Sequence, residues 1–438
     1  MRIMILLTAM MTTVVQADPA SVSLLAAYDS SRHFDPAYQA ASFDFEATQQ
    51  EEDIGLAGLL PQVSIGSRYG ETKQLRDQVD NASRDDASAN GALTLSARQV
   101  LYNKSQAAFY QQSKARGAVG NALYDDASQE LFNRVTESYF EVARQDNELK
   151  LATQQRNAIE ALVKQTRRLF EAGDGTITDT EEAQARLDLI KAQEIEYQAR
   201  VRAALHKLSG RSGLIVENIS TLRDSLPANV MLQAPHDLSY WRQKALEVAP
   251  KLGARRATIQ LAEAELESQH AGNYPTLSLV SELSSTKQDD FDPNARHQSS
   301  YYIGLSMDLP IYSGGGVTAS INKSQSALSS AMAQYDNGVQ QIRDDIERDY
   351  LGVVSGYEKC KALRTAVKSS QRALDSAEKG YQAGVRSTVD ILNAQQVLYA
   401  AKRDLLNSKL FMLQSYVSLH VQTGQMHRGI LEHIQELL

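Results

Sequence analysis

The chain has little of the residue types on which most enzymes and disulfide-rich proteins depend. Its 438 residues include one tryptophan and one cysteine, Cys360. A lone cysteine cannot form an intramolecular disulfide, and its position far from the N-terminus excludes an N-terminal lipid anchor. The eight histidines show no metal-ligand spacing, and no Gly-x-Ser-x-Gly motif occurs. We therefore predict no catalytic residue, no metal site and no cofactor, and we interpret Cys360 as a small side chain packed on a helix.

Proline is absent from two long stretches of the sequence. None of the nine prolines lies in residues 62–226 or 311–438, which together hold about 290 residues. Ordinary usage of about 5% would place roughly 15 prolines there. Because proline interrupts helices, two long uninterrupted helical elements are predicted.

Long apolar runs are also missing, except at the N-terminus. Arg2, the apolar run from Ile3 to Val15 and the small-residue site ending at Ala17 predict a signal peptide over residues 1–17, and hence export from the cytoplasm. No later run reaches the roughly 18 residues of a transmembrane helix. Integral contact with a membrane would therefore require strands closed into a barrel. The net charge of −8 argues against a nucleic-acid partner.

The sequence repeats itself after about 210 residues. The segment 170–173, followed by Asp179, recurs as the segment 381–384, followed by Asp390, at a separation of 211 residues. The segment 100–102 recurs as 310–312, and Asp35-Pro36 recurs as Ala249-Pro250. We predict a signal peptide over 1–17, a first structural repeat over 18–226, a second repeat over 227–424 and a C-terminal tail over 425–438.

Each repeat shows the same order of predicted elements. Helices over 36–60 and 250–274 are each followed by two period-2 strands, around 63–65 and 93–97 in the first repeat and around 277–283 and 303–309 in the second. Polar loops are predicted at 70–90 and 284–300. Long helices over 103–169 and 317–379 and shorter helices over 180–208 and 388–424 complete the repeats.

Apolar residues at heptad spacing mark the long helices as coiled-coil elements. In the first repeat the seam includes Leu187 and Ile190 and continues around Glu194. In the second repeat the predicted seam is Leu328, Met332, Tyr335, Val339, Ile342 and Ile346. The last helix carries a double stripe, with Ile391, Leu398, Leu405, Met412 and Leu419 beside Leu392, Tyr399, Leu406 and Leu413. Such a wide stripe can meet neighbours on two sides.

Four amphipathic strands per chain are too few to close a barrel. We therefore predict an α+β membrane protein in which several identical chains form a β-barrel, continued by a long antiparallel α-helical coiled-coil tunnel. Each repeat is expected to pack its long helix against two shorter ones.

The duplicated order of elements carries a resemblance to a known family. It is carried by Leu309-Pro310-Ile311-Tyr312-Ser313-Gly314-Gly315-Gly316, Gly380-Tyr381-Gln382-Ala383-Gly384 and Val389-Asp390-Ile391-Leu392. With these motifs the chain resembles the TolC family of outer-membrane export channels over essentially the whole mature sequence. The segments 168–176 and 222–227 resemble the branch that serves type I secretion of proteases and lipases.

The resemblance implies an assembly and its partners. It implies a homotrimer with a twelve-stranded barrel in outer-membrane lipid and a tunnel in the periplasm, a periplasmic adaptor, and an inner-membrane ATP-binding-cassette exporter. A multidrug efflux channel, which would serve a proton-driven pump, and a periplasmic coiled-coil scaffold without a pore remain as alternatives.

The resemblance also implies a gate at the two turns where the coils reverse. Asp390 matches the first aspartate of the pore ring, and Asn393 stands at the second ring position, where better-known members have aspartate. The positions that link the gate are matched by Tyr381 and Arg386, and the partner turn is matched by Thr178 and Asp179. The tips contacted by the adaptor are matched by Gly173, Gly175 and Gly384.

The same residues also fit a purely structural role at the ends of helices. Ser387-Thr388-Val389-Asp390 and Thr178-Asp179-Thr180-Glu181 both fit a capping box, in which an acidic side chain satisfies backbone N–H groups at a helix start. The three glycines fit helix ends that need positive φ. The run 313–316 lacks the lysine of a phosphate loop and is interpreted as a joint between strand and helix.

Overall fold

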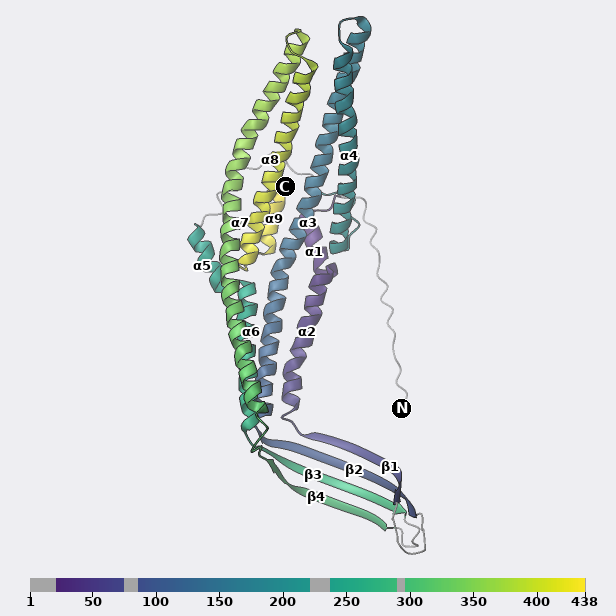
Figure 1. The fold of residues 1–438 in the computed structure, drawn as a ribbon, viewed down its shortest axis with the longest axis vertical. Coiled ribbons are helices and arrows are strands. Elements are labelled where there is room, and N and C mark those ends of the chain that lie inside the picture. The colour runs from purple at the N-terminus through teal and green to yellow at the C-terminus, as the bar shows by residue number, and fades with distance from the viewer. Residues whose placement is uncertain (1–20, 75–85, 221–236, 290–295, 438) are drawn as a thin grey trace. The chain divides into compact units, whose positions relative to one another are not determined.

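The computed structural model describes residues 21–74, 86–220, 237–289 and 296–437 (Figure 1). The predicted signal peptide and the segment 222–227 lie outside the described residues, so these predictions are not tested. The chain forms two compact units. We call residues 40–127 and 248–343 the strand unit, and the rest, namely residues up to 39, 128–247 and 344–438, the helical unit.

The strand unit contains one antiparallel sheet and the helices next to it in sequence. Its strands are β1 (Gln62–Gln74), β2 (Asp86–Asn103), β3 (Thr276–Asp289) and β4 (Arg296–Asp308), in the order β1-β2-β3-β4. Its helices are α2 (Pro36–Ala57), α6 (Pro250–His270), the 3₁₀ turn η2 (Ala271–Asn273) and the first parts of α3 (Lys104–Ala172) and α7 (Gly316–Gln382). The predicted strands and helices are therefore confirmed, and pairing of β2 with β3 joins the two hairpins.

The predicted polar loops are longer than the structure allows. Residues 70–74 and 86–90 belong to β1 and β2 and pair with each other, and residues 284–289 and 296–300 pair within β3 and β4. These ends are rich in polar residues, but the ladder satisfies their backbone N–H and C=O groups whatever the side chains are. Composition alone therefore placed the loop boundaries too far inside the strands.

One face of the sheet is apolar and exposed. Ile65 pairs with Leu95, Leu95 with Leu283 and Leu283 with Tyr301, so the four side chains form a row across all four strands. Each of them is between 44% and 71% exposed. Neighbouring positions face the other way, and there Arg98 donates to the Ser278 hydroxyl at 3.2 Å. The sheet thus presents an uncovered apolar surface on one side only.

Close helix contacts in the strand unit depend on small residues. A Cβ atom at Gly55 of α2 would lie 2.6 Å from the Ser113 hydroxyl of α3, so only glycine allows this approach. In the second repeat, Arg255 of α6 contacts α7. Its side chain lies over Gly338 and donates to the Gln334 carbonyl at 2.8 Å. In the single chain the predicted seam of α7 is only partly buried, since Met332 is 45% exposed whereas Ala331 beside it is 8% exposed.

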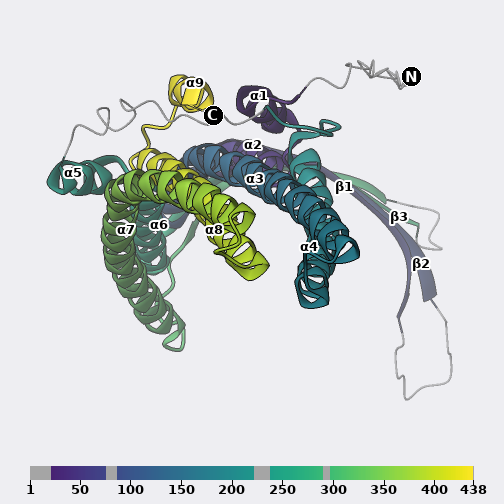
Figure 2. The same ribbon diagram turned by 90° about the horizontal axis from the view of Figure 1, so that it is seen from above.

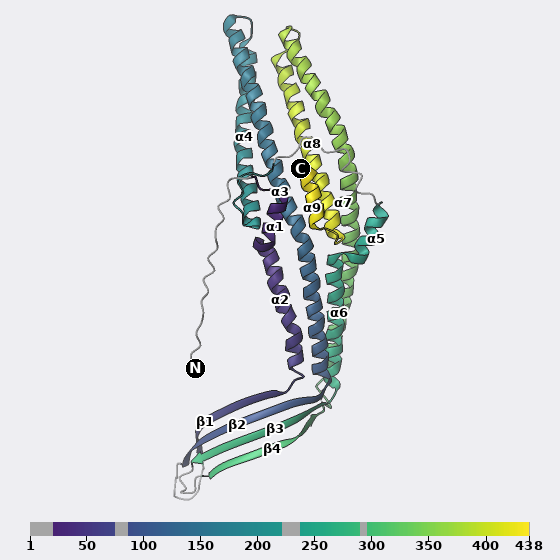
Figure 3. The same ribbon diagram turned by 180° about the vertical axis from the view of Figure 1, so that it is seen from behind.

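The helical unit consists of two antiparallel hairpins and three short helices. One hairpin joins the second part of α3 to α4 (Ile177–Ser212), and the other joins the second part of α7 to α8 (Thr388–Gln422) (Figures 1 and 3). The short helices α1 (Leu24–Phe34), α5 (Leu238–Val248) and α9 (Arg428–Leu437) carry 10 or 11 residues each and were not predicted. Figure 2 shows α1 beside α9, where the Gln435 side chain accepts from the Leu25 N–H at 3.0 Å.

The apolar stripes of the hairpin helices are buried as predicted. Ile391, Leu398, Met412 and Leu419 of the last stripe are at most 4% exposed, and Leu405 is half-buried. Cys360 is buried on α7. Among the helices of the described residues, we found none with the length and hydropathy required for a membrane crossing.

Candidate functional site

The two hairpin turns are built alike. Gly173 (φ 83°) ends α3 and Gly384 (φ 72°) ends α7. At the first turn the Asp174 N–H donates to the Leu169 carbonyl at 2.9 Å, and at the second the Val385 N–H donates to the Gly380 carbonyl at 2.9 Å. A hydrogen bond that spans six residues and encloses a residue with positive φ defines the Schellman motif. Both glycines therefore end helices as predicted, because a Cβ atom disfavours positive φ.

Gly175 does not have the positive φ predicted for a helix end. The only described residues with positive φ are other glycines, and Gly175 is not among them. A Cβ atom at Gly175 would instead lie 3.0 Å from the Leu169 Cβ and 3.1 Å from the Phe170 N. Glycine is needed there because the chain passes close to the last turn of α3.

Asp390 and Asp179 occupy equivalent cap positions. The Ser387 N–H donates to the Asp390 carboxylate at 2.9 Å, and the Asp390 N–H donates to the Ser387 hydroxyl at 3.3 Å, so the predicted capping box of α8 is present. At α4 the cap is Thr176, whose hydroxyl accepts from the Asp179 N–H at 3.1 Å. The predicted box starting at Thr178 is therefore wrong, because the cap of α4 lies two residues earlier and the helix begins at Ile177.

Hydrogen bonds hold both carboxyl groups in the charged form. The pKa of Asp390 is lowered, mainly by the backbone N–H and the hydroxyl of Ser387, and to a smaller extent by Arg386. The pKa of Asp179 is lowered mainly by the Thr176 hydroxyl. A smaller contribution to Asp179 comes from Thr388, which is fully buried at the start of α8. Asp179 of the first turn therefore lies against the second turn.

Arg386 is placed by its neighbours on the second turn. Its Nη1 lies 3.5 Å from the Asp390 Oδ1, and its N–H donates to the Gly380 carbonyl at 3.2 Å. A Cβ atom at Gly380 would lie 2.6 Å from the Arg386 Cγ, so the arginine stem occupies the space that glycine leaves. The guanidinium remains 60% exposed, and such a pair contributes little to stability.

The other predicted gate residues differ in their surroundings. Tyr381 packs against the apolar cluster of the helical unit, whereas Thr178 is exposed. In the part of the chain that the structure describes, no hydrogen bond joins Tyr381 or Thr178 to the facing turn. Asn393 is exposed and lines a shallow groove of about 390 Å³ on α7 and α8, together with Ser369 and Val397. The structure thus brings together Arg386 with Asp390, and Asp179 with Thr388.

One apolar cluster connects the two hairpins. It contains residues from all four helices, and all of its members are at most 7% exposed. Its members include Ile159 of α3, Leu187 and Ile190 of α4, Leu374 of α7 and Leu398 of α8. Because burial of such side chains stabilises by about 1.5–3 kcal/mol each, this cluster fixes how the turns face one another.

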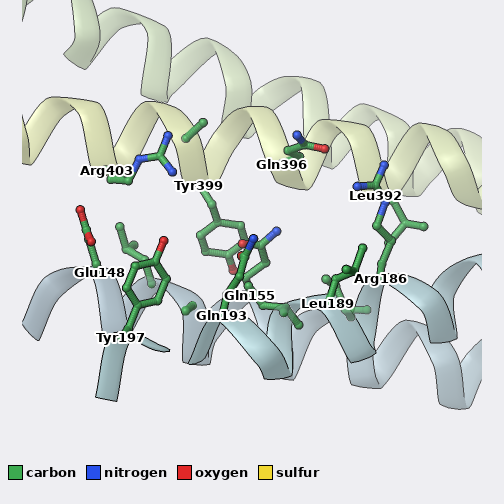
Figure 4. Close-up of a pocket in the computed structure, with 15 residues that line it drawn as sticks. Glu148, Gln155, Arg186, Leu189, Gln193, Tyr197, Leu392, Gln396, Tyr399 and Arg403 are labelled. Carbon is green, nitrogen blue, oxygen red and sulfur yellow. The ribbon is translucent and has the colours of Figure 1, made fainter. Parts of the chain in front are cut away.

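A cavity of about 250 Å³ interrupts this packing between α3, α4 and α8 (Figure 4). Figure 4 shows Glu148 and Tyr197 at one end with Arg403 across from them, and Arg186 near Leu392 at the other end. No serine, cysteine or histidine lines it. The described residues also include no group of three or more histidine, cysteine, aspartate or glutamate side chains placed to hold a metal ion.

The sequence interpretation missed Thr176, Gly380 and Thr388. Thr176 could have been found, because Thr176 and Asp179 lie 211 residues before Ser387 and Asp390, in the same repeat frame as the matched turns. Thr388 has no such signal, since its role depends on the approach of α4 to α8.

The chain is similar to known proteins over most of its length. A sequence profile of the family described as outer membrane efflux protein matches residues 27–213 and 241–425. The proteases secretion protein PrtF of Dickeya chrysanthemi is 31% identical, over 93% of this chain and 89% of the relative. The alkaline protease secretion protein AprF of Pseudomonas aeruginosa is 27% identical, over 98% and 90%. The solved structure of CusC shares the fold, with a TM-score of 0.78, 16% identity and 93% coverage of each chain.

Proposed function

Because the chain belongs to the outer membrane efflux protein family, it is an outer-membrane export channel, and we propose that it is the passive conduit of a type I protein secretion system. The chain spans most of the length of two relatives whose names describe protease secretion. We propose that it carries out no enzymatic step and works with a periplasmic adaptor and an inner-membrane ATP-binding-cassette exporter.

The names of these relatives support the secretion role, and the apolar face of the sheet supports the place in the outer membrane. The row formed by Ile65, Leu95, Leu283 and Tyr301 is uncovered, and an exposed apolar surface of this kind requires a nonaqueous neighbour. The outer edges of β1 and β4 also pair with no other described strand. Three copies joined edge to edge would satisfy both edges and turn this face toward outer-membrane lipid. We further propose the division into two repeats at residues 226 and 227.

Secretion assays distinguish protein export from drug efflux. A strain that lacks the gene should lose protease from the culture supernatant and regain it when the wild-type chain is supplied. Unchanged protease secretion together with increased drug sensitivity would favour the efflux alternative instead. A chain that forms no heat-resistant oligomer in outer-membrane fractions and no conducting pore in planar bilayers would point to the scaffold.

We propose that the two turns are the periplasmic gate, with Asp390, Asn393, Arg386, Tyr381, Asp179 and Thr178 at the constriction. Gly173, Gly175 and Gly384 are then at the tips that contact the adaptor. The support is local: Asp179 and Asp390 keep negative charge at the starts of α4 and α8, and the two turns meet at Thr388. Asn393 removes the second acidic ring, so we expect weaker cation selectivity than two aspartates would produce.

Combined replacement of Arg386 by serine and Asp390 by alanine tests the gate. It removes the capping box of α8 and the ion pair beside it, so we expect a severalfold higher single-channel conductance in planar bilayers. The matched control is Arg428→Ser with Asp29→Ala, which breaks an exposed ion pair of 3.0 Å between α9 and α1. Equal conductance of the gate variant and the wild type would reject the gate assignment.

A further inference from the structure

The short helix α5 buries one aromatic side chain against the rest of the helical unit. Trp241 is 2% exposed, and Ala245 on the next turn of α5 is fully buried. Figures 1 and 3 both show α5 beside α7. The helix begins at Asp237, whose carboxylate accepts from the Tyr240 N–H at 3.1 Å. An 11-residue helix is too short to be stable alone, so its order depends on this attachment.

Trp241 rests on a buried histidine of α8. The ring centroids of Trp241 and His420 are 5.1 Å apart, with the planes at 71°, which is an edge-to-face contact. His420 also contacts the Tyr416 ring, with the ring centroids 4.4 Å apart. His420 is only 9% exposed. The imidazole therefore touches two aromatic rings, one of which belongs to α5.

The hydrogen bond of His420 identifies which ring nitrogen carries the hydrogen when the imidazole is neutral. The ring Nδ1 lies 2.9 Å from the Tyr416 carbonyl oxygen. A carbonyl can only accept, so Nδ1 carries the hydrogen and Nε2 is the nitrogen that takes up a proton. Burial lowers the pKa of His420, and His427 adds to this effect, whereas the Tyr416 carbonyl raises it. The attached state therefore disfavours the charged imidazole.

Of the other charged groups near α5, one ion pair is weak and one buried carboxylate, Asp349, acts in the opposite direction at lower pH. Arg242 of α5 pairs with Glu347 of α7 at 2.6 Å, but both side chains are more than 40% exposed, so the pair is weak. On α7, Asp349 is bonded to Gln422 at 2.7 Å and lies beside Arg348. Burial raises the pKa of Asp349 above 3.8, so acid relieves the cost of its buried charge.

We propose that α5 is a pH-sensitive clasp on the α7/α8 hairpin, and that protonation of His420 releases Trp241 and with it α5. The sign follows from linkage. A released His420 has an ordinary pKa of about 6.5 and takes up a proton before the attached one does. Attachment therefore weakens as the pH falls below about 6.5, and the opposite contribution of Asp349 begins only nearer its own lower range.

Trp241 is the only tryptophan of the chain, so its fluorescence reports on this contact alone. In the full-length oligomer in detergent, lowering the pH from about 7.5 to about 5.5, across the range of histidine titration, should shift the emission to longer wavelength. The acrylamide quenching constant should at least double, and amides of α5 should exchange faster relative to those of α9. His420→Asn keeps an N–H donor but cannot titrate, so these changes should disappear.

The control is His427→Asn, since His427 is exposed and outside the ring contacts. This variant should keep the transition and move its midpoint slightly to lower pH, because the attached His420 loses one neighbour that disfavours its charged form. An unchanged wild-type spectrum and unchanged α5 exchange would overturn the clasp, as would a transition that persists in His420→Asn. Quenched emission without a red shift or greater acrylamide access would also overturn it, because His420 would then titrate with α5 still attached.

Discussion

Replacement of Asp35 by alanine is expected to lower the free energy of unfolding of the helical unit by about 3 kcal/mol. The Asp35 side chain is 3% exposed and lies 2.7 Å from the Arg134 Nη2. The same carboxylate accepts from the Tyr38 N–H at 2.8 Å and so caps α2. Alanine removes the cap and leaves the Arg134 guanidinium, which is 22% exposed, without its charge partner. Thermal denaturation and hydrogen exchange of α1 would measure the loss.

Two further variants separate the contributions at Asp35. Asp35→Asn retains an oxygen that can cap α2 but removes the charge, so we expect an intermediate loss of stability. Asp29→Ala, in α1, breaks only the exposed pair with Arg428 and should cost less than about 1 kcal/mol. Equal effects of Asp29→Ala and Asp35→Ala would contradict the assignment of Asp35 as a buried connector of α1, α2 and α3.

Replacement of Glu194 by alanine should destabilise the α3/α4 hairpin by about 2 kcal/mol. Glu194 stands in the apolar seam of α4, and its side chain is 10% exposed. One carboxylate oxygen lies 3.2 Å from the Arg156 Nη1, and the other accepts from the Thr153 hydroxyl at 2.9 Å. Alanine removes the charge partner of Arg156 and the acceptor of the Thr153 hydroxyl, both on α3. Hydrogen exchange of the hairpin amides, compared with those of α9, would detect the change.

Glu196→Ala is the matched control for Glu194. It lies on the same helix, but its partner Arg200 is on the surface and one turn away. We expect its effect to remain within about 0.5 kcal/mol. A similar loss of protection in both variants would show that the polar cluster of Glu194 does not hold the hairpin together.

The elements of the fold were accessible from the sequence because each has a local signature. The proline-free stretches contain α3 and α7, and the double stripe that starts at Ile391 is buried along α8. The strands followed from period-2 patterns, although their ends did not, since β-ladder pairing extends through polar residues at 70–74 and 86–90. The heptad pattern did not show that Ala331 is buried in the single chain while Met332 beside it is exposed.

The candidate site was predictable in part for the same reason. The capping box of Ser387 and Asp390 spans four residues and was read correctly, whereas the cap of α4 was assigned to Thr178 in place of Thr176. Both boxes fit the local pattern, and only the observed helix start distinguishes them. Thr388 beside Asp179 was missed because these residues are 209 positions apart.

The amino-acid sequence by itself determined the order, type and approximate length of the elements, their repetition and the family resemblance, since these depend on spacing within short segments. The contacts between distant segments came from the tertiary structure alone. Asp179 meets Thr388, Asp35 meets Arg134, and Trp241 meets His420 across 179 residues. Periodicity shows which face of a helix is buried, but the choice of partner depends on how the helices pack, and that packing sets the charge and burial of each of these groups.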